Sequence, residues 1–179
     1  MRGSMQPHYE LRPVDVSDLP LLAKWSSRPH VARWFGGAGP DADELNDTRI
    51  AMWIAMLGSQ PFAYIHDYDV HAWSPHHFDF LPPGSRGIDM YIGDPELVGL
   101  GHGSRLLRQH SDVLMSRGAP ALGIDPHPDN HAAIRANEKA GFVVVSGPTE
   151  TQWGRVLLMT RNPNRPQMRP PSVEPANSR

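Results

Sequence analysis

GIDMYI at residues 87–92, GLGHGS at residues 99–104 and NHAAIRANEKAGF at residues 130–142 are the segments that decide the fold of this chain. The first segment has the composition of a strand. The second places three glycines at the start of an amphipathic helix expected over residues 103–116. The third has apolar residues at helical spacing and ends at Gly141. A strand, a glycine loop and two helices therefore form the centre of the predicted fold.

The chain on both sides of these segments supplies the remaining elements. We expect strands at residues 8–12, 51–57, 62–65, 87–93, 121–125, 142–145 and 156–160, a helix from Asp15 or Ser17 to about residue 25, a helical segment at 28–35, and a second late helix capped by Asp129 or Asn130. Strands and helices alternate in the second half, which favours an α/β chain. The glycine run at residues 36–40 predicts a mobile loop or the rim of a ligand site, and residues 71–85 predict a functional loop.

Length and composition exclude several classes of protein. The 179 residues, 39% of them hydrophobic, predict a single domain at residues 7–162, after a cloning remnant at 1–6 and before a disordered tail at 163–179. A net charge of −2 without a basic block argues against nucleic acid as a partner. The chain has no cysteine and no apolar run of the roughly 20 residues that span a bilayer. We therefore expect a soluble, cytoplasmic protein that binds no membrane.

The glycine loop at residues 99–104 predicts an anion site. Glycines before a helix let backbone N–H groups converge where the helix dipole also favours negative charge, as a pyrophosphate requires. A plain flexible connection between strand and helix is the alternative. A Walker loop is excluded because the Gly-Lys-Ser/Thr ending is missing, and the spacing G-x-G-x-G fits a Rossmann fingerprint poorly.

The order of these segments resembles the acetyl-CoA-binding half of the GNAT superfamily of acyltransferases. More specifically, RGID at residues 86–89, DP at 125–126 and WFGG at 34–37 resemble the aminoglycoside 6'-N-acetyltransferases and the related siderophore-biosynthesis acetyltransferases. The resemblance covers about residues 9–162. It implies the GNAT fold, a twisted mixed sheet whose central parallel strands splay apart and which helices flank. It also implies an acetyltransferase that uses acetyl-CoA as cosubstrate and a small polycationic amine as acceptor.

The resemblance also implies which residues bind the cosubstrate. The pantetheine arm would lie between the splayed strands at residues 89–93 and 121–125, and the loop amides would hold the pyrophosphate. The implied cofactor-binding residues are Met90, Tyr91, Ile92, Val98, Gly99, Leu100, Gly101, His102, Gly103, Ser104, Asn130, Ala133, Asn137 and Lys139. Val98 departs from the family, which usually has Arg or Gln there, so one side-chain contact to phosphate is missing from the pattern.

Three residues are candidates for the proton transfers. An alkyl ammonium must lose a proton before it attacks a thioester, and Asp89, which matches an aspartate of the related enzymes, is the predicted proton acceptor. The alternative is a structural pairing of Asp89 with Arg86. Many relatives place a tyrosine at Asn137 to protonate the departing thiolate, which an asparagine cannot do. Tyr91 or water would then take that role.

The acceptor site is expected to carry carboxylates for the cationic amine and aromatic walls for sugar rings. The candidates are Trp25, Trp34, Asp67, Tyr68, Asp69, Asp79, Asp89 and Asp125, with Trp73 as a further wall. Residues His66, His71, His76 and His77 raise the question of a metal, but no H-E-x-x-H pattern or third ligand accompanies them, so we expect none.

Two other functions stay open at this point. A siderophore-type enzyme would acylate a hydroxylamine and would need Arg or Lys for the carboxylate of its acceptor. A catalytically inactive module would bind CoA or a polyamine without transfer, as Asn137 and Met90 suggest. The oligomeric state is expected to be a monomer or a homodimer.

Overall fold

The computed structural model describes residues 8–162, so the predictions for residues 1–6 and 163–179 lie outside the described part. The strands are β1 (Glu10–Pro13), β2 (Ile50–Leu57), β3 (Gln60–Asp69), β4 (Arg86–Ile92), β5 (Leu122–Ile124), β6 (Val143–Val144), β7 (Thr149–Thr151), β8 (Gly154–Val156) and β9 (Met159–Arg161). The helices are α1 (Leu19–Ser26), α2 (Pro29–Phe35), α3 (Ala42–Leu45), α4 (His102–Ser116) and α5 (His131–Lys139), with 3-10 turns η1 (Val16–Asp18) and η2 (Pro95–Leu97).

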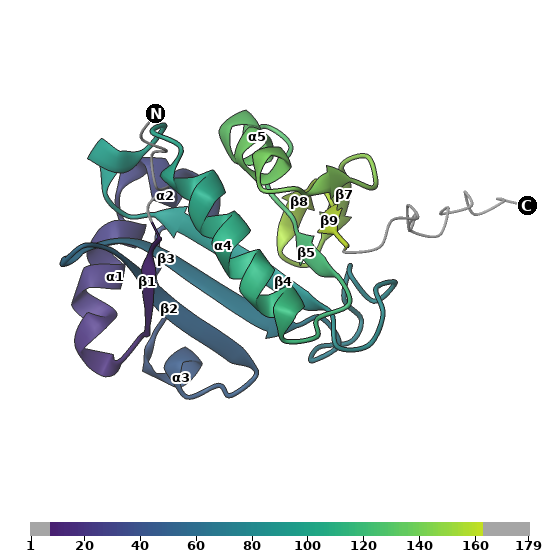
Figure 1. Ribbon diagram of the computed structural model, residues 1–179, viewed down its shortest axis with the longest axis horizontal. Coiled ribbons are helices and arrows are strands. Elements are labelled where there is room, and N and C mark those ends of the chain that lie inside the picture. The colour runs from purple at the N-terminus through teal and green to yellow at the C-terminus, as the bar shows by residue number, and fades with distance from the viewer. Residues whose placement is uncertain (1–7, 163–179) are drawn as a thin grey trace, which may run out of the picture.

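The centre of the fold is a seven-stranded sheet with the order β1-β2-β3-β4-β5-β9-β6 (Figure 1). Strands β4 and β5 pair in parallel, and the other ladders of this sheet are antiparallel. Long strands β2 and β3 form the predicted hairpin through a turn at Gly58, whose φ of 61° suits glycine. The predicted mixed sheet flanked by helices is confirmed.

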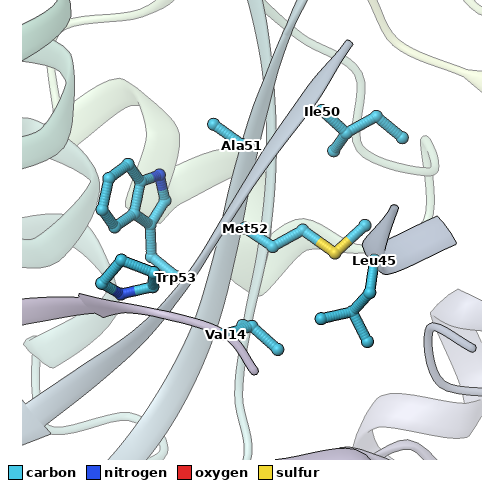
Figure 2. Close-up of a pocket in the computed structure, with 7 residues that line it drawn as sticks. Val14, Leu45, Ile50, Ala51, Met52 and Trp53 are labelled. Carbon is cyan, nitrogen blue, oxygen red and sulfur yellow. The ribbon is translucent and has the colours of Figure 1, made fainter. Parts of the chain in front are cut away.

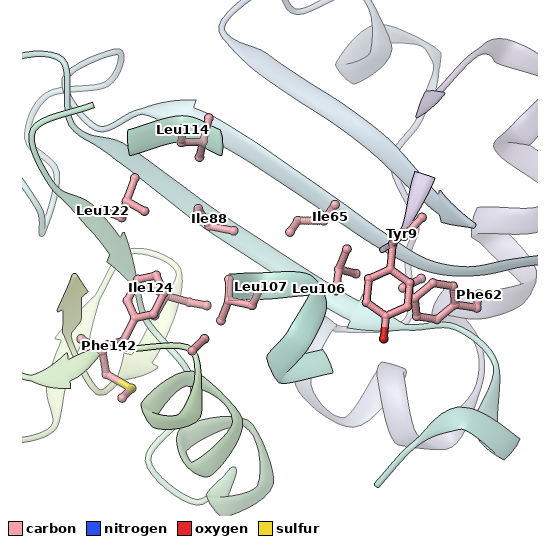
Figure 3. Close-up of a cluster of buried hydrophobic side chains, with 14 residues drawn as sticks. Tyr9, Phe62, Ile65, Ile88, Leu106, Leu107, Leu114, Leu122, Ile124 and Phe142 are labelled. Carbon is pink, nitrogen blue, oxygen red and sulfur yellow. The ribbon is translucent and has the colours of Figure 1, made fainter. Parts of the chain in front are cut away.

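Helices cover both faces of the sheet. Alternate residues of each strand point to opposite faces, and both faces carry apolar side chains. Ile65 and Ile88 face α4, and Leu106 and Leu107 of that helix pack on them in the largest buried cluster (Figure 3). Residues Tyr64 and Tyr91 point to the other face, against α1 and α2. Side chains on the two faces of β3 and β4 therefore have separate surroundings.

The parallel pair β4 and β5 separates after a short ladder. Its paired residues are Arg86↔Leu122 and Gly87↔Gly123, although β4 continues to Ile92. Aromatic rings lie directly on the two paired glycines: a Cβ on Gly87 would lie 2.2 Å from the Tyr68 ring, and one on Gly123 would lie 2.8 Å from the Phe78 ring. Larger residues at this rung would collide with these rings, so glycine is needed where the splay begins.

The end of the domain differs from the predicted strand over residues 156–160. Strand β8 ends at Val156 and pairs with β7 in a separate hairpin, whereas β9 begins at Met159 and joins the main sheet. Between them the N–H of Leu157 donates to the carbonyl of Pro126, which bends the chain from one sheet to the other. The single predicted strand is therefore corrected to two strands in different sheets.

A search for membrane spans over residues 8–162 finds no helix with the length and apolar character that crossing a bilayer requires.

Candidate active site

One large cleft follows the separation of β4 from β5. It has a volume of about 1810 Å³ and takes its walls from α2, β3, β4, the glycine loop, α5, the segment at residues 73–77 and the β7–β8 hairpin. The predicted site residues that line it are Trp34, Tyr68, Asp89, Met90, Tyr91, Ile92, Val98, Gly99, Gly101, Gly103, Ser104, Asp125, Asn130, Ala133, Asn137 and Lys139. Trp73 also lines it. The glycine loop and the two aspartates thus share one continuous space.

A second, smaller pocket lies on β2 beside α3 and has a volume of about 240 Å³. Figure 2 shows Leu45 and Met52 on one side of β2 and Trp53 on the other. Its lining residues are Pro13, Val14, Leu45, Ile50, Ala51, Met52 and Trp53. None of these side chains titrates, so acid–base chemistry can arise only in the large cleft among these two pockets.

The glycine loop presents the first turn of α4 to the cleft. Gly99 and Gly101 have φ values of 80° and 83°, which glycine adopts without strain. Gly101 is the N-cap of α4 and has no side chain to bond the first N–H groups of the helix. Arg105 Nη2 donates to the carbonyl of Leu100 over 3.0 Å, which holds the loop against the helix. The helix start can therefore receive an anion through backbone N–H groups.

Two residues of the loop do not bring their side chains into the cleft. Leu100 is 59% exposed and does not line the cleft. His102 points back to the start of the domain, where its Nδ1 lies 2.8 Å from the hydroxyl of Tyr9. Their predicted side-chain roles are corrected, because neither side chain lines the cleft, and only their backbone groups remain as predicted contacts.

Asp89 and Asp125 stand on either side of the splay. The last residue pair before the strands separate is Gly87↔Gly123. Asp89 lies two residues after Gly87, and Asp125 lies two residues after Gly123. Residues two apart point to the same face, so both carboxylates lie on the face of the rings that cover the two glycines. Both line the cleft. The backbone thus places two carboxylates together where the sheet opens.

Asp89 has a histidine as its partner. His66 Nε2 lies 3.1 Å from Asp89 Oδ2, and the hydroxyl of Tyr64 lies 3.0 Å from His66 Nδ1. The alternative that Asp89 pairs with Arg86 is wrong, because Arg86 Nη2 lies 2.6 Å from Asp67 Oδ1 instead. The side chain of Asp89 is 32% exposed, so it can reach a bound molecule.

Asp125 has a different histidine as its partner. Its Oδ2 lies 2.8 Å from Nε2 of His77, and its side chain is only 12% exposed. Burial raises the pKa of Asp125, the neighbouring His77 opposes that rise, and the nearby charge of Asp89 adds to it. The rings of His77 and His76 stack at 4.1 Å, and Trp153 from the β7–β8 hairpin packs on both. Burial, and then the neighbouring His77, lower the pKa of His76 to about 4, so His76 is neutral at pH 7.

Tyr91, the side-chain candidate for thiolate protonation, and Asn137, which stands where many relatives have a tyrosine, are both buried. The hydroxyl of Tyr91 lies 3.3 Å from that of Ser26, and burial raises the pKa of Tyr91 although this hydrogen bond opposes the rise. Tyr91 is therefore protonated at neutral pH. Asn137 is 4% exposed, and its Nδ2 donates to the sulfur of Met159 over 3.7 Å.

Two backbone carbonyl groups at the end of β4 already have hydrogen-bond partners from side chains. Nε2 of His30 lies 2.9 Å from the carbonyl oxygen of Ile92, and Arg28 Nη1 donates to the carbonyl of Gly93 over 2.6 Å. Of the predicted backbone contacts, the carbonyl of Ile92 therefore already has a partner from α2.

The structure corrects the prediction that Asp67 lines the acceptor site. Asp67 lies on β3 next to His66 but points to the opposite face, where its side chain is 4% exposed. There it accepts hydrogen bonds from Arg86, His110 and Trp53. Asp67 is therefore part of a buried polar network beneath α4.

Three further predictions are corrected in the same way. Asp69 accepts the backbone N–H of His71 over 2.9 Å, and Asp79 accepts that of His76 over 2.8 Å. Both carboxylates brace the loop that follows β3 and lie outside the cleft lining. Trp25 is 3% exposed and packs on Gly93, where a Cβ would lie 2.0 Å from its ring. It packs against the backbone just after β4 and does not line the cleft.

No three or more side chains of His, Cys, Asp or Glu are grouped to hold a metal ion within residues 8–162.

Several residues of the cleft were not predicted as site residues. The sequence pattern suggests the histidines at positions 66, 76 and 77 only as metal ligands, and it does not point to Glu44 or Trp153, although all five line the cleft. The only available signal for the histidines was that His66 alternates with Tyr64 and Tyr68 on one strand face. Trp153 lies at the tip of a hairpin that the sequence pattern did not reveal.

Comparison with known proteins identifies relatives that have this architecture. Residues 15–147 match the family model of the acetyltransferase (GNAT) domain. The aminoglycoside N(6')-acetyltransferase type 1 of Klebsiella pneumoniae is 33% identical over 148 residues, covering 74% of this chain and 72% of that protein. The kanamycin resistance protein of Rhizobium radiobacter is 39% identical over 61 residues, covering 34% of this chain and 56% of that protein.

Solved structures agree with the sequence comparison. The aminoglycoside acetyltransferase AAC(6')-Ib in complex with ribostamycin and coenzyme A superimposes with a TM-score of 0.78 at 29% identity, covering 88% of this chain and 94% of that one. Its complex with coenzyme A and kanamycin gives a TM-score of 0.76 at 27% identity over 87% and 95% of the two chains. The chain therefore belongs to the GNAT acetyltransferases and, within them, to the family of the aminoglycoside 6'-N-acetyltransferases.

Proposed function

We propose that this chain is an N-acetyltransferase that transfers the acetyl group of acetyl-CoA to an amino group of an aminoglycoside. The observation that carries the proposal is the single cleft that joins the glycine loop to the pair Asp89 and Asp125. The glycine loop suits a pyrophosphate, and the two aspartates at the other end of the cleft suit a cationic amine. The relatives named above are aminoglycoside acetyltransferases, which supports an aminoglycoside as the acceptor.

The residues of the loop fit acetyl-CoA. Gly99 and Gly101 have backbone conformations that residues with side chains rarely adopt, and the N-terminus of the 15-residue helix α4 faces the cleft without a capping side chain. The N–H groups of His102, Gly103 and Ser104 would hold the pyrophosphate, and Lys139 adds a positive charge to the cleft lining. When bound, acetyl-CoA supplies an acetyl group already activated as a thioester.

We assign to Asp89 the role of taking a proton from the acceptor amine. A carboxylate beside the splay binds the ammonium form of the acceptor and then takes a proton from it, so that the amine has a free electron pair. Asp125 adds a second carboxylate for another ammonium group. The charged or titratable partners within hydrogen-bond distance of these two aspartates are His66 and His77. Within residues 8–162 neither aspartate forms an ion pair with Arg or Lys, although Arg33, Arg135, Lys139 and Arg155 also line the cleft. Two carboxylates paired only with histidines favour a cationic acceptor over the carboxylate-bearing siderophore intermediates.

A release assay for CoA thiol tests the function. Purified protein and acetyl-CoA are incubated with aminoglycosides, simple polyamines and hydroxylamino acids, and the free thiol is followed. We expect turnover with aminoglycosides and a product heavier by one acetyl group. Turnover confined to hydroxylamino acids would assign the siderophore-type reaction. Binding of CoA without turnover on any acceptor would show an inactive module.

Gly103→Val should weaken CoA binding by about tenfold or more, the scale of a lost hydrogen bond to a charged group. A Cβ at Gly103 would lie 3.6 Å from Ile92, an ordinary contact, so we expect the domain to fold while the larger side chain covers the helix start. Calorimetry with CoA measures the effect. Gly118→Ala, at the other end of α4, strains a glycine with φ of 101° and serves as the control for lost stability alone. Equal affinities in Gly103→Val and the parent protein would remove the loop from the proposed site.

Asn137→Tyr tests whether the missing acid limits the rate. Asn137 lines the cleft, so a tyrosine there can reach the departing thiolate. If thiolate protonation is partly rate-limiting, kcat should rise severalfold with little change in the KM for acetyl-CoA. Because Asn137 also bonds Met159, the melting temperature is measured in parallel. A lower kcat in a stably folded Asn137→Tyr, with a lower kcat in Tyr91→Phe, would assign the proton to Tyr91. An unaffected Tyr91→Phe would leave it to solvent.

A further inference from the structure

We propose that His66 is a positioning residue: its imidazole, oriented by Tyr64, holds one oxygen of the Asp89 carboxylate and leaves the other oxygen for the acceptor amine. The inference rests on the proposed function, because it concerns how Asp89 does its work there. It gives a role in acetyl transfer to a histidine that the sequence pattern suggested only as a metal ligand.

The sheet itself sets the three side chains in line. His66 and Asp89 are direct cross-strand partners in the antiparallel ladder of β3 and β4. Such partners have Cβ atoms about 5 Å apart, which suits an imidazole that bridges to a carboxylate. Tyr64 lies two residues before His66 on the same face of β3, and the two rings are 5.5 Å apart. Hydrogen bonds of 3.0 Å and 3.1 Å join Tyr64 to His66 and His66 to Asp89.

The direction of these hydrogen bonds follows from the chemistry of the two ends. An ionised carboxylate only accepts, so Nε2 of His66 carries the hydrogen that faces Asp89. In a neutral ring Nδ1 is then an acceptor, and the hydroxyl of Tyr64 must donate to it. Tyr64 is 4% exposed, and burial raises its pKa well above the usual value, so the hydroxyl keeps its proton. The chain of donors therefore runs from Tyr64 through His66 to Asp89.

This direction separates positioning from proton relay. Because Nε2 already carries a hydrogen, neutral His66 cannot take a proton from Asp89 at that atom. What it does is anchor Oδ2, so that the free electron pairs of Oδ1 face the cleft, where 32% of the side chain is exposed. A base that is held in one orientation loses less freedom when the acceptor arrives, and a misplacement of about 1 Å can cost about 10²-fold in rate.

His66→Leu and His66→Gln form the test pair. Leucine removes both hydrogen bonds, and we expect kcat to fall by about 10-fold to 10²-fold while the KM for acetyl-CoA stays within about twofold. Glutamine can donate to Asp89 and accept from Tyr64, so it should restore most of the rate. In the Asp89→Asn background His66→Leu should add no further loss, because the two residues act as a unit. An equal loss in both backgrounds, or a normal rate in His66→Leu, would overturn the proposal.

A measurement that needs no turnover completes the test. In the free protein with ¹⁵N-labelled histidine, NMR in alkaline buffer should show His66 as the Nε2–H tautomer, with its signal identified by its absence from His66→Gln. An Nδ1–H tautomer would overturn the proposal. The two failures remain distinct: absence of turnover in the unaltered protein counts against the proposed function, whereas the wrong tautomer or an active His66→Leu counts against the role of His66 alone.

Discussion

Asp89→Asn should lower kcat for amine acetylation by at least about 10²-fold while CoA binds as before. The substitution keeps the size of the side chain and removes its charge, so the residue can no longer take a proton from the acceptor. Asp89 lies beside the splay, 3.1 Å from His66, and does not belong to the glycine loop. Steady-state rates at saturating acceptor, with calorimetry for CoA, separate the two effects.

Asp94→Asn is the matched control. Asp94 is close to Asp89 in sequence, but its carboxylate accepts from Gln60 over 2.7 Å and lies outside the cleft lining. Its rate should stay within about twofold of the parent, as expected for a surface change away from the site. If Asp89→Asn retains a rate within a few-fold of the parent across the pH range, Asp89 is structural and the base lies elsewhere.

Asp67→Ala should lower the free energy of unfolding by about 3–5 kcal/mol, because it leaves Arg86 and His110 without their common carboxylate. Both the aspartate and His110 have side chains only 4% exposed, so water cannot replace the lost partner. Urea unfolding at pH 7 measures the change. Asp69→Ala on the same strand removes a carboxylate that accepts one backbone N–H, and it should cost about 1 kcal/mol. Equal losses in the two variants would show that the network beneath α4 contributes nothing special.

The effect of Asp67 should depend on pH with a defined sign. Burial acts to raise its pKa, but the hydrogen bonds from His110 and Arg86 outweigh burial and leave the pKa below its ordinary value. A carboxyl group whose pKa is lowered by folding stabilises fully above its unfolded pKa of about 3.9, and this contribution is lost as the pH falls through the folded pKa. The difference in stability between the parent and Asp67→Ala should therefore shrink below about pH 4. A constant difference down to the acid limit would contradict the assignment.

The sequence predicted the parts of the site that depend on neighbouring residues. The glycine loop, helix α4 and strand β4 each follow from local composition, since a glycine conformation or a helical repeat is decided within a few residues. The family resemblance lies in the same local motifs, at residues 86–89, 99–104 and 130–142. In these segments the structure changes only the predicted side-chain roles of Leu100 and His102.

The acceptor end was predicted less well, because its residues come from segments far apart in the chain. Asp67 and His66 are adjacent in the sequence, yet only His66 faces the cleft. Strand β3 is buried on both faces over most of its length, so no alternation of polar and apolar residues reveals which face each side chain takes. Asp69, Asp79 and Trp25 were also predicted to line the acceptor site because of their residue types. Their contacts with distant segments place them outside the cleft.

By itself, the sequence determined that this chain is an α/β domain with a glycine loop before a helix and an aspartate at the head of a strand. Only the tertiary structure decided that Asp89 meets His66, that Asp125 meets His77, and that the β7–β8 hairpin brings Trp153 against the rings of His76 and His77. The physical reason is the range of the interactions involved. Local conformation is set by a residue and its near neighbours, whereas the partner of a buried polar group is set by strand register and by the packing of distant segments.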